Sequence, residues 1–142
     1  MPADNTNLTQ VAFSGTGSFT TPKALNTTSR FTSDAFAFSA DATDCKFQFK
    51  VDNQGTPASG DTVTVQLALS IDGGTTYDTD EHARSVAYLD TYATNDPGED
   101  PATRTYTVDV RGATHGKILA KAAQGGTRTI NFSAQFNEHT AT

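Results

Sequence analysis

The chain has 142 residues, of which 35% are hydrophobic, and it carries a formal net charge of -6. This length suits one domain that buries a core without disulfides or metal ions. The ten Lys and Arg residues are scattered singly. Because binding of DNA or RNA needs clustered basic residues, we do not expect a nucleic-acid partner.

Cellular location follows from two further features of the sequence. Cys45 is the single cysteine, so the fold cannot depend on an internal disulfide or on an oxidising compartment. The opening residues MPADNTNLTQ have neither the basic start nor the apolar run of a signal peptide, and no window approaches the ~18 apolar residues of a membrane span. We therefore expect folding in a cytosol and no membrane partner.

The predicted elements begin with a polar segment. Residues 1–10 are rich in Asn and Thr, which is typical of an arm, and residues 11–142 are predicted to form the folded domain. In that domain apolar residues alternate with polar ones in short runs, as in strands with one face in water. In chain order these runs are 11–13, 36–38, 45–51, 63–71, 86–88, 106–110, 118–122 and 130–136.

The fold class follows from these runs and the turns between them. Gly, Pro, Asp and Asn separate the runs, and seven to nine short strands at this spacing predict an all-β fold, a single antiparallel β-sandwich. Both a jelly-roll and an immunoglobulin-like order of strands remain open. Residues 80–89 have a weaker alternative as one or two helical turns. The run 130–136 is predicted to be a central strand, and Cys45 a small buried hydrophobe.

The most distinctive stretch is SIDGGTTYDTDEH, residues 70–82. Ser70, Asp72, Gly74 and Tyr77 match the pattern S-x-D-x-G-x-x-(W/Y), which resembles the Asp-box, a hairpin motif of sialidases and other β-propellers. The resemblance implies that the Asp caps backbone N–H groups, the Gly takes a positive φ and the aromatic ring packs beneath. One copy in 142 residues cannot build a propeller. We therefore expect the hairpin geometry and not the sialidase activity.

The acids that follow this turn leave several alternatives open. Asp78, Asp80 and Glu81, with Asp72, have the hard oxygen ligands that calcium prefers. The spacing of an EF-hand is absent, so these acids either stay solvated, hold an ion or contact a neighbouring subunit. A second acidic cluster comprises Asp96, Glu99 and Asp100. No cofactor and no metal site are predicted.

Signals for catalysis are absent from the sequence. His82, His115 and His139 stand outside any metal-binding motif, Ser85 forms no triad pattern with His82, and no G-x-S-x-G elbow occurs. We therefore predict no catalytic residues and no enzymatic activity. Sugar binding on aromatic side chains is an alternative, and the candidate rings are Tyr77, Tyr88, Tyr92 and Tyr106.

The sequence as a whole resembles a family of virion proteins. The relevant features are an acidic β-sandwich with a polar arm, a strand ending in SIDGGTTY, and the segment TYTVDVRG followed by GKILAKAA. Over residues 60–136 the sequence is similar to the small accessory proteins of tailed bacteriophages, in particular capsid decoration (cement) proteins. The resemblance implies a non-enzymatic structural protein that binds the major capsid protein lattice, is made in the host bacterial cytoplasm and resides on the capsid surface.

The same resemblance implies partners and contact residues. It implies a homo-oligomer, with a trimer favoured, and we expect the polar arm to contact the capsid through Asn5, Asn7, Leu8 and Gln10. Two alternatives remain: a carbohydrate-binding or receptor-binding accessory module, and a head-tail or tail structural subunit.

Overall fold

The structure is a computed structural model that describes residues 8–14, 22–55, 60–91, 102–123 and 129–140. Ten strands and no helix occur in these ranges, so none of the described residues forms a helix long and apolar enough to cross a membrane. The strands are β1 (Leu8–Gln10), β2 (Lys23–Leu25), β3 (Arg30–Thr32), β4 (Phe36–Ala37), β5 (Ala42–Asn53), β6 (Thr62–Ser70), β7 (Arg84–Asp90), β8 (Ala102–Asp109), β9 (His115–Ala123) and β10 (Ile130–Thr140).

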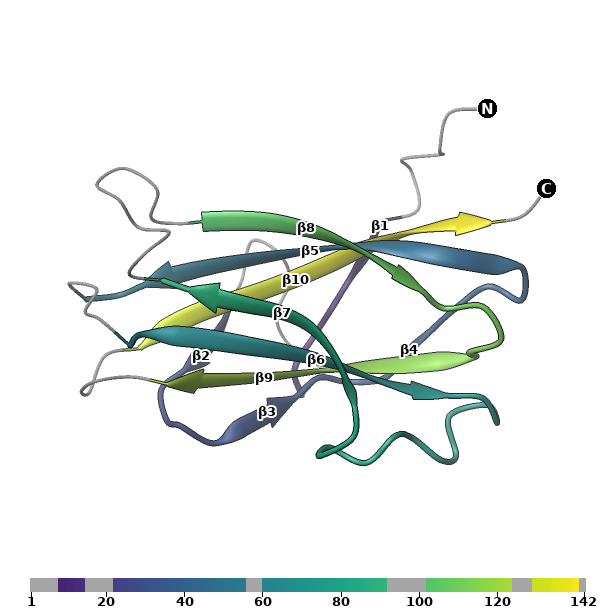
Figure 1. The fold of residues 1–142 in the computed structure, drawn as a ribbon, viewed down its shortest axis with the longest axis horizontal. Coiled ribbons are helices and arrows are strands. Elements are labelled where there is room, and N and C mark those ends of the chain that lie inside the picture. The colour runs from purple at the N-terminus through teal and green to yellow at the C-terminus, as the bar shows by residue number, and fades with distance from the viewer. Residues whose placement is uncertain (1–7, 15–21, 56–59, 92–101, 124–128, 141–142) are drawn as a thin grey trace.

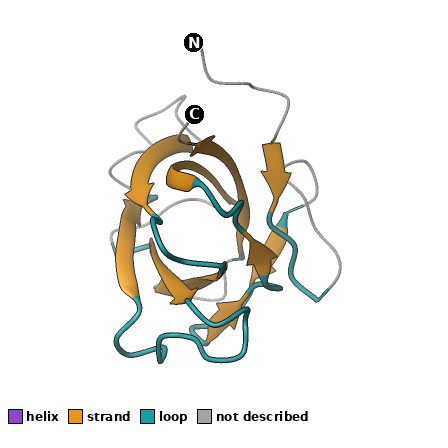
Figure 2. Cartoon of the chain, turned by 90° about the vertical axis from the view of Figure 1, so that its right-hand side faces the viewer, coloured by secondary structure: helices purple, strands orange, loops and turns teal. Residues whose placement is uncertain are grey.

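Two antiparallel sheets pack against each other, as Figures 1 and 2 show, and this confirms the predicted β-sandwich. The first sheet has the order β1-β10-β5-β8, with β2 also paired to β10. The second sheet has the order β3-β9-β6-β7, with β4 also paired to β9. Since β1 and β2 share one side of β10, and β3 and β4 share one side of β9, each sheet has four strand positions.

The order of pairing decides between the two predicted topologies. Strand β6 pairs with β7, β5 pairs with β8, β3 and β4 pair with β9, and β1 and β2 pair with β10. Each pair encloses the one before it, as in a long hairpin rolled into two sheets, which is the jelly-roll arrangement. An immunoglobulin-like sandwich places strands A, B, E and D together in one sheet, which this order does not do.

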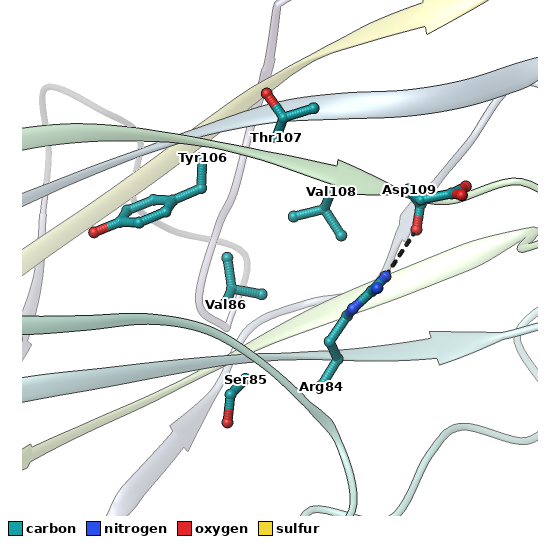
Figure 3. A pocket seen from close by; sticks show the side chains of 7 residues that line it. All are labelled: Arg84, Ser85, Val86, Tyr106, Thr107, Val108 and Asp109. Atoms are coloured by element: carbon teal, nitrogen blue, oxygen red, sulfur yellow. Dashed lines mark hydrogen bonds between the residues drawn. The ribbon is translucent and has the colours of Figure 1, made fainter.

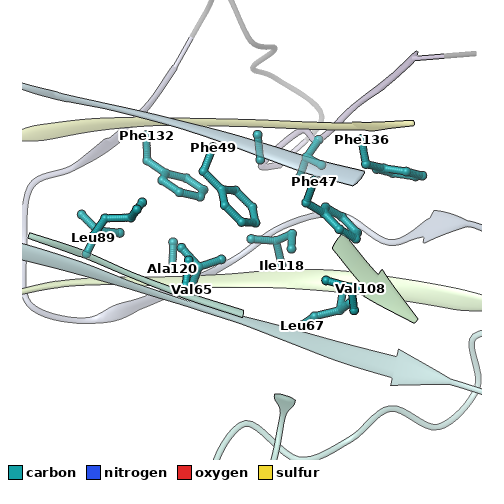
Figure 4. Close-up of a cluster of buried hydrophobic side chains, with 14 of the residues drawn as sticks. Phe47, Phe49, Val65, Leu67, Leu89, Val108, Ile118, Ala120, Phe132 and Phe136 are labelled. Carbon is teal, nitrogen blue, oxygen red and sulfur yellow. The ribbon is translucent and has the colours of Figure 1, made fainter. Parts of the chain in front are cut away.

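The core lies between the sheets, and its largest side chains are phenylalanines (Figure 4). Phe47 and Phe49 of β5 and Phe132 and Phe136 of β10 are fully buried, because alternate residues of these strands face inward. The rings of Phe49 and Phe132 stack with centroids 5.8 Å apart. The second sheet supplies smaller aliphatic side chains opposite them, including Val65, Leu67 and Ile118. Each fully buried side chain of this kind stabilises the fold by about 1.5–3 kcal/mol.

The N-terminal prediction is wrong in part. Leu8–Gln10 form β1 at the edge of the first sheet, paired with Gln135–Asn137 of β10, and do not belong to an arm outside the domain. Three residues with one apolar side chain carry no alternation, so the sequence offered no signal for this strand. Val11 and Phe13 that follow are buried in the core.

Two further predictions are corrected by the second sheet. The helical alternative for residues 80–89 is wrong, because Arg84–Asp90 form β7 and pair with β6. Ile71, placed by periodicity at the end of the preceding strand, is 79% exposed, because the strand ends at Ser70 where the turn begins.

Candidate functional site

The turn after β6 is organised by the carboxylate of Asp72. Its Oδ1 accepts the backbone N–H groups of Thr75 (3.2 Å) and Thr76 (2.8 Å) and the hydroxyl of Ser70 (2.8 Å). The Thr76 N–H above all, with the Ser70 hydroxyl, lowers the pKa of Asp72 from its ordinary value of 3.8 to about 2. The side chains of the turn therefore satisfy its own backbone groups.

Two glycines give this turn its backbone path. Gly73 and Gly74 have φ of +78° and +87°, in the left-handed region that favours glycine. A Cβ at Gly74 would also lie 3.1 Å from the Tyr77 hydroxyl. Tyr77 is half-buried and packs against a small cluster of Ala68, Ala83 and Leu119.

The rest of the connection, residues 75–83, folds back over the outer face of the second sheet. Asp78 pairs with Leu69 of β6 through its backbone N–H and its carboxylate, both at 3.0 Å. Gln66 donates to the backbone carbonyls of Asp80 and Ala83, both at 3.2 Å. The connection thus covers apolar side chains that would otherwise face water.

The three acids of this connection point to different partners. The Asp78 carboxylate accepts the Leu69 N–H, Asp80 lies 3.9 Å from Arg30, and Glu81 is exposed. Within the described ranges, no group of three or more His, Cys, Asp or Glu side chains is placed to hold a metal ion. The geometry gives the calcium hypothesis for Asp78, Asp80 and Glu81 no support.

A ladder of polar side chains crosses the outer face of the first sheet. Gln10 donates to Gln135 (2.9 Å), Gln135 donates to Gln48 (2.8 Å), and Gln48 donates to Thr105 (3.3 Å). These residues lie side by side on β1, β10, β5 and β8 in the register of the sheet. We call these four side chains the amide ladder.

The rows beside the amide ladder are also polar. Lys46 donates to Thr107 at 3.2 Å in the next row, where Leu8 is 51% exposed at the edge. On the other side of the ladder, Lys50 lies between Ser133 and Thr103. The centre of this face therefore combines amides, hydroxyls and two ammonium groups.

The predicted capsid-contact residues fall in two places. Leu8 and Gln10 lie on the outer face of the first sheet, and Gln10 begins the amide ladder, whereas Asn5 and Asn7 lie outside the described residues. Gln48, Gln135 and Thr105 were not predicted to act together. Their polar positions in alternating strands were visible, but only the register shows that they are neighbours.

A seam separates the edges of the two sheets where β7 faces β8 (Figure 3). Tyr106, Val108 and Val86 point into it, and Arg84 Nη1 donates to the backbone carbonyl of Asp109 at 3.1 Å. The cavity is about 160 Å³, which is below the 300–1,000 Å³ of a typical ligand pocket. The seam therefore suits structural contacts better than a small molecule.

A larger hollow of about 310 Å³ lies at one end of β5 and β10. It is lined by Asp44, Lys46, Asn137, Glu138 and His139, and His139 Nδ1 lies 3.1 Å from Asp44 Oδ1.

Cys45 is fully buried, as predicted. Burial, with Glu138 and Asp44 nearby, raises the pKa of its thiol to about 12, so it is no nucleophile at neutral pH.

The remaining candidate side chains do not converge. Tyr77 packs against the second sheet from the connection between β6 and β7, the 66% exposed Tyr88 belongs to β7, and Tyr106 lies in the seam. His82 and His115 contact neighbouring threonine hydroxyls. Tyr92, Asp96, Glu99 and Asp100 lie outside the described residues.

Comparison with known proteins gives a structural likeness and no match by sequence. No protein-family model matches the sequence, and no curated protein matches it. The chain is similar to part of a solved family GH115 4-O-methyl-alpha-glucuronidase with specificity for decorated arabinogalactans, at 13% identity and a TM-score of 0.49. The match covers 94% of this chain and 16% of that enzyme's chain.

Proposed function

We propose that this protein is a non-enzymatic structural protein of a bacteriophage particle, a capsid decoration protein that binds the major capsid protein lattice on the virion surface. Residues 60–136 support this proposal through their resemblance to tailed-phage accessory proteins. The observation that carries it is the polar outer face of the first sheet, with the amide ladder at its centre.

The amide ladder suits a docking face because its side chains are ordered before a partner arrives. Immobilising a long polar side chain on binding costs about 0.5–1.5 kcal/mol. In Gln10, Gln48 and Gln135 the hydrogen bonds along the ladder already restrict the side chains. Amide and hydroxyl groups also suit the polar, partly hydrated interfaces of proteins that fold separately and associate later.

The frame behind this face consists of two long paired strands over a buried core, which suits a protein that reinforces a shell. Strands β5 and β10 pair along nearly their whole length, and their inner faces bury the stacked phenylalanines. A load on the outer face is thus passed to a close-packed core.

The test is binding to capsids that lack decoration. Purified protein is mixed with such capsids, and bound protein is measured after sedimentation, while virions are analysed by mass spectrometry. Gln135→Glu keeps the side-chain shape but removes the donor to Gln48 and adds a charge, so we expect at least tenfold weaker binding. Thr64→Glu adds the same charge to the exposed outer face of the second sheet and serves as the control. Failure of the unmodified protein to bind, and its absence from virions, would reject the proposal.

A second candidate function is carbohydrate binding at the hollow lined by Asp44 and His139. Its volume of about 310 Å³ reaches the lower end of the range of ligand pockets, and its lining offers hydrogen-bond donors and acceptors. A glycan array probed with and without calcium tests this function, and binding that disappears in Asp44→Ala would support it. No binding to any glycan would remove it.

A further inference from the structure

Strand β8 forms an unusually complete edge of the sandwich. It is the last strand of the first sheet and pairs with β5 from Ala102 to Asp109 without a register shift. The other edge strands in the described ranges are interrupted: β1 to β4 have two or three residues each, and the pairing of β7 with β6 is shifted next to Val65. Long regular edges are templates for pairing with another chain.

The backbone groups that β8 directs to this edge can be assigned. The Val110 N–H donates to the Thr43 carbonyl at 3.1 Å. Val110 and the alternate residues before it therefore direct their backbone N–H and C=O groups toward β5. The backbone N–H and C=O groups that face the outer edge therefore belong to the residues between them: Thr103, Thr105, Thr107 and Asp109. The bond from Arg84 to the Asp109 carbonyl agrees with this direction.

Arginine side chains limit how much of the edge another strand can use. Arg84 reaches from β7 and occupies the space beside the Asp109 carbonyl (Figure 3). Arg104 Nη1 donates to the Thr103 carbonyl at 3.1 Å, but this exposed side chain belongs to β8 itself and can turn aside. The usable stretch is thus 102–108, whose midpoint is Thr105.

We propose that a second copy of this chain pairs with this edge, β8 against β8 in antiparallel orientation, with Thr105 opposite Thr105. In this register Thr103 lies opposite Thr107 of the other copy, and these threonines exchange their outward backbone bonds. A register centred on Tyr106 would instead need the Asp109 carbonyl beside Arg84. The contact is twofold symmetric, with the same surface used by both copies.

The side chains complement each other in this register. On the outer face, threonines meet threonines, a favourable cross-strand pair. On the inner side, Arg104 of each copy lies opposite Tyr106 of the other, where its guanidinium can stack on the ring. An inward-pointing charge usually protects an edge strand from pairing. Here the second copy supplies an aromatic partner for that charge.

The amide ladder also continues across this contact. The Thr105 hydroxyl accepts from Gln48 at 3.3 Å and retains one proton to donate. In the pair this proton faces the hydroxyl of Thr105 in the other copy. Two ladders that each end at β8 thereby join at the symmetry axis, and the two first sheets become one continuous sheet.

This pairing goes beyond the proposed function and does not depend on it. It produces a closed dimer, whereas the resemblance to decoration proteins implies a trimer. Capsid binding and β8 pairing are measured separately, so one can fail while the other holds.

Engineered disulfides test the pairing and its register together. Opposed residues of a hydrogen-bonded antiparallel pair have Cα atoms about 5.5 Å apart, within the range for a disulfide. Thr105→Cys should therefore link two copies under mild oxidation. Thr103→Cys and Thr107→Cys are matched controls, since each lies roughly 14 Å from its own counterpart. Neither should link alone, but an equal mixture of the two should. Buried Cys45 does not interfere.

Light scattering on the unmodified protein gives a second measurement that needs no substitution. We expect a mass of twice 15.0 kDa at high concentration. Thr105→Pro removes an N–H that points away from β5, so it should halve this mass while the circular dichroism spectrum stays that of a β-sheet protein. A mass of 15.0 kDa or three times that value for the unmodified protein, or equal linking in Thr103→Cys alone, would overturn the proposal.

Discussion

The hydroxyl of Ser33 accepts the backbone N–H of Ile118 at 2.9 Å, and the Ser33 N–H donates to the Ile118 carbonyl at 2.8 Å. Ser33 lies just after β3, where the edge of the second sheet is interrupted before β4 resumes the pairing with β9. Its side chain therefore bonds a strand N–H at a point where the edge backbone turns away.

Replacing Ser33 with Ala should destabilise the fold by about 1–3 kcal/mol, because the buried N–H of Ile118 would lose this acceptor. Urea unfolding followed by circular dichroism measures the change. Ser29→Ala, at an exposed position in the preceding turn, is the control and should change stability by less than about 0.5 kcal/mol. Equal stability of the two variants would contradict the bridging role of Ser33.

Replacing Asp72 with Ala should lower the melting temperature by a few degrees, because Thr75 and Thr76 lose the acceptor of their N–H groups. Differential scanning calorimetry measures the shift. Asp80→Ala in the same connection removes only an exposed ion pair at 3.9 Å and should leave the melting temperature unchanged. An unchanged melting temperature in Asp72→Ala would mean that the glycines alone hold the turn.

Acid should weaken the same turn in a defined pH window. The folded pKa of Asp72 is lowered to about 2 from 3.8, so its stabilising effect is complete above pH 3.8 and is lost as the pH falls toward about 2. Asp72→Asn should therefore differ from the unmodified protein at neutral pH, and the difference should shrink across this window. Denaturation at a series of pH values measures it, and a constant difference would contradict the shifted pKa.

Replacing Gly116 with Ala should destabilise the core by about 1–3 kcal/mol through overpacking. A Cβ at this position in β9 would lie 2.8 Å from Cε1 of Phe36 and 3.1 Å from Cζ of Phe38. Phe36→Leu in the same chain should make the effect of Gly116→Ala smaller, because it removes the nearer ring. Additive effects of the two changes in urea unfolding would show that the contact is not the cause.

The thiol of Cys45 should resist alkylation in the folded protein. It is fully buried, so an alkylating reagent does not reach it. Its pKa is raised to about 12, so the reactive thiolate does not form near neutral pH. Mass spectrometry after iodoacetamide treatment should show labelling only in denaturant. Rapid labelling of the native protein would contradict the buried position.

The long strands were predictable because each carries its own signal. Alternation in β5, β6 and β10 places one set of side chains in the core, whatever the neighbouring strand is. The short edge strands β2 and β3 lack such a signal, and their pairing with β10 and β9 depends on residues far along the chain. The choice of a jelly roll depends on the same long-range pairing, which local alternation does not contain.

The candidate sites divide in the same way. The bonds from Asp72 to the following residues lie within one turn, so a local pattern was enough to suggest them. The amide ladder joins residues from four strands, among them Gln10 and Gln135 at opposite ends of the chain. Only a known register brings these glutamines together, and no spacing in the sequence contains it.

The enclosed order of strand pairs has a consequence for how the chain assembles. The β6–β7 pair closes the shortest loop, and each further pair, β5 with β8 and then β9 and β10 with the first strands, joins segments that the previous pair has already brought near. Folding should thus proceed from the Asp72 turn outward, with β1 docking last. Because most contacts join residues that are far apart in the sequence, the folding time should lie in the millisecond-to-second range of all-β domains.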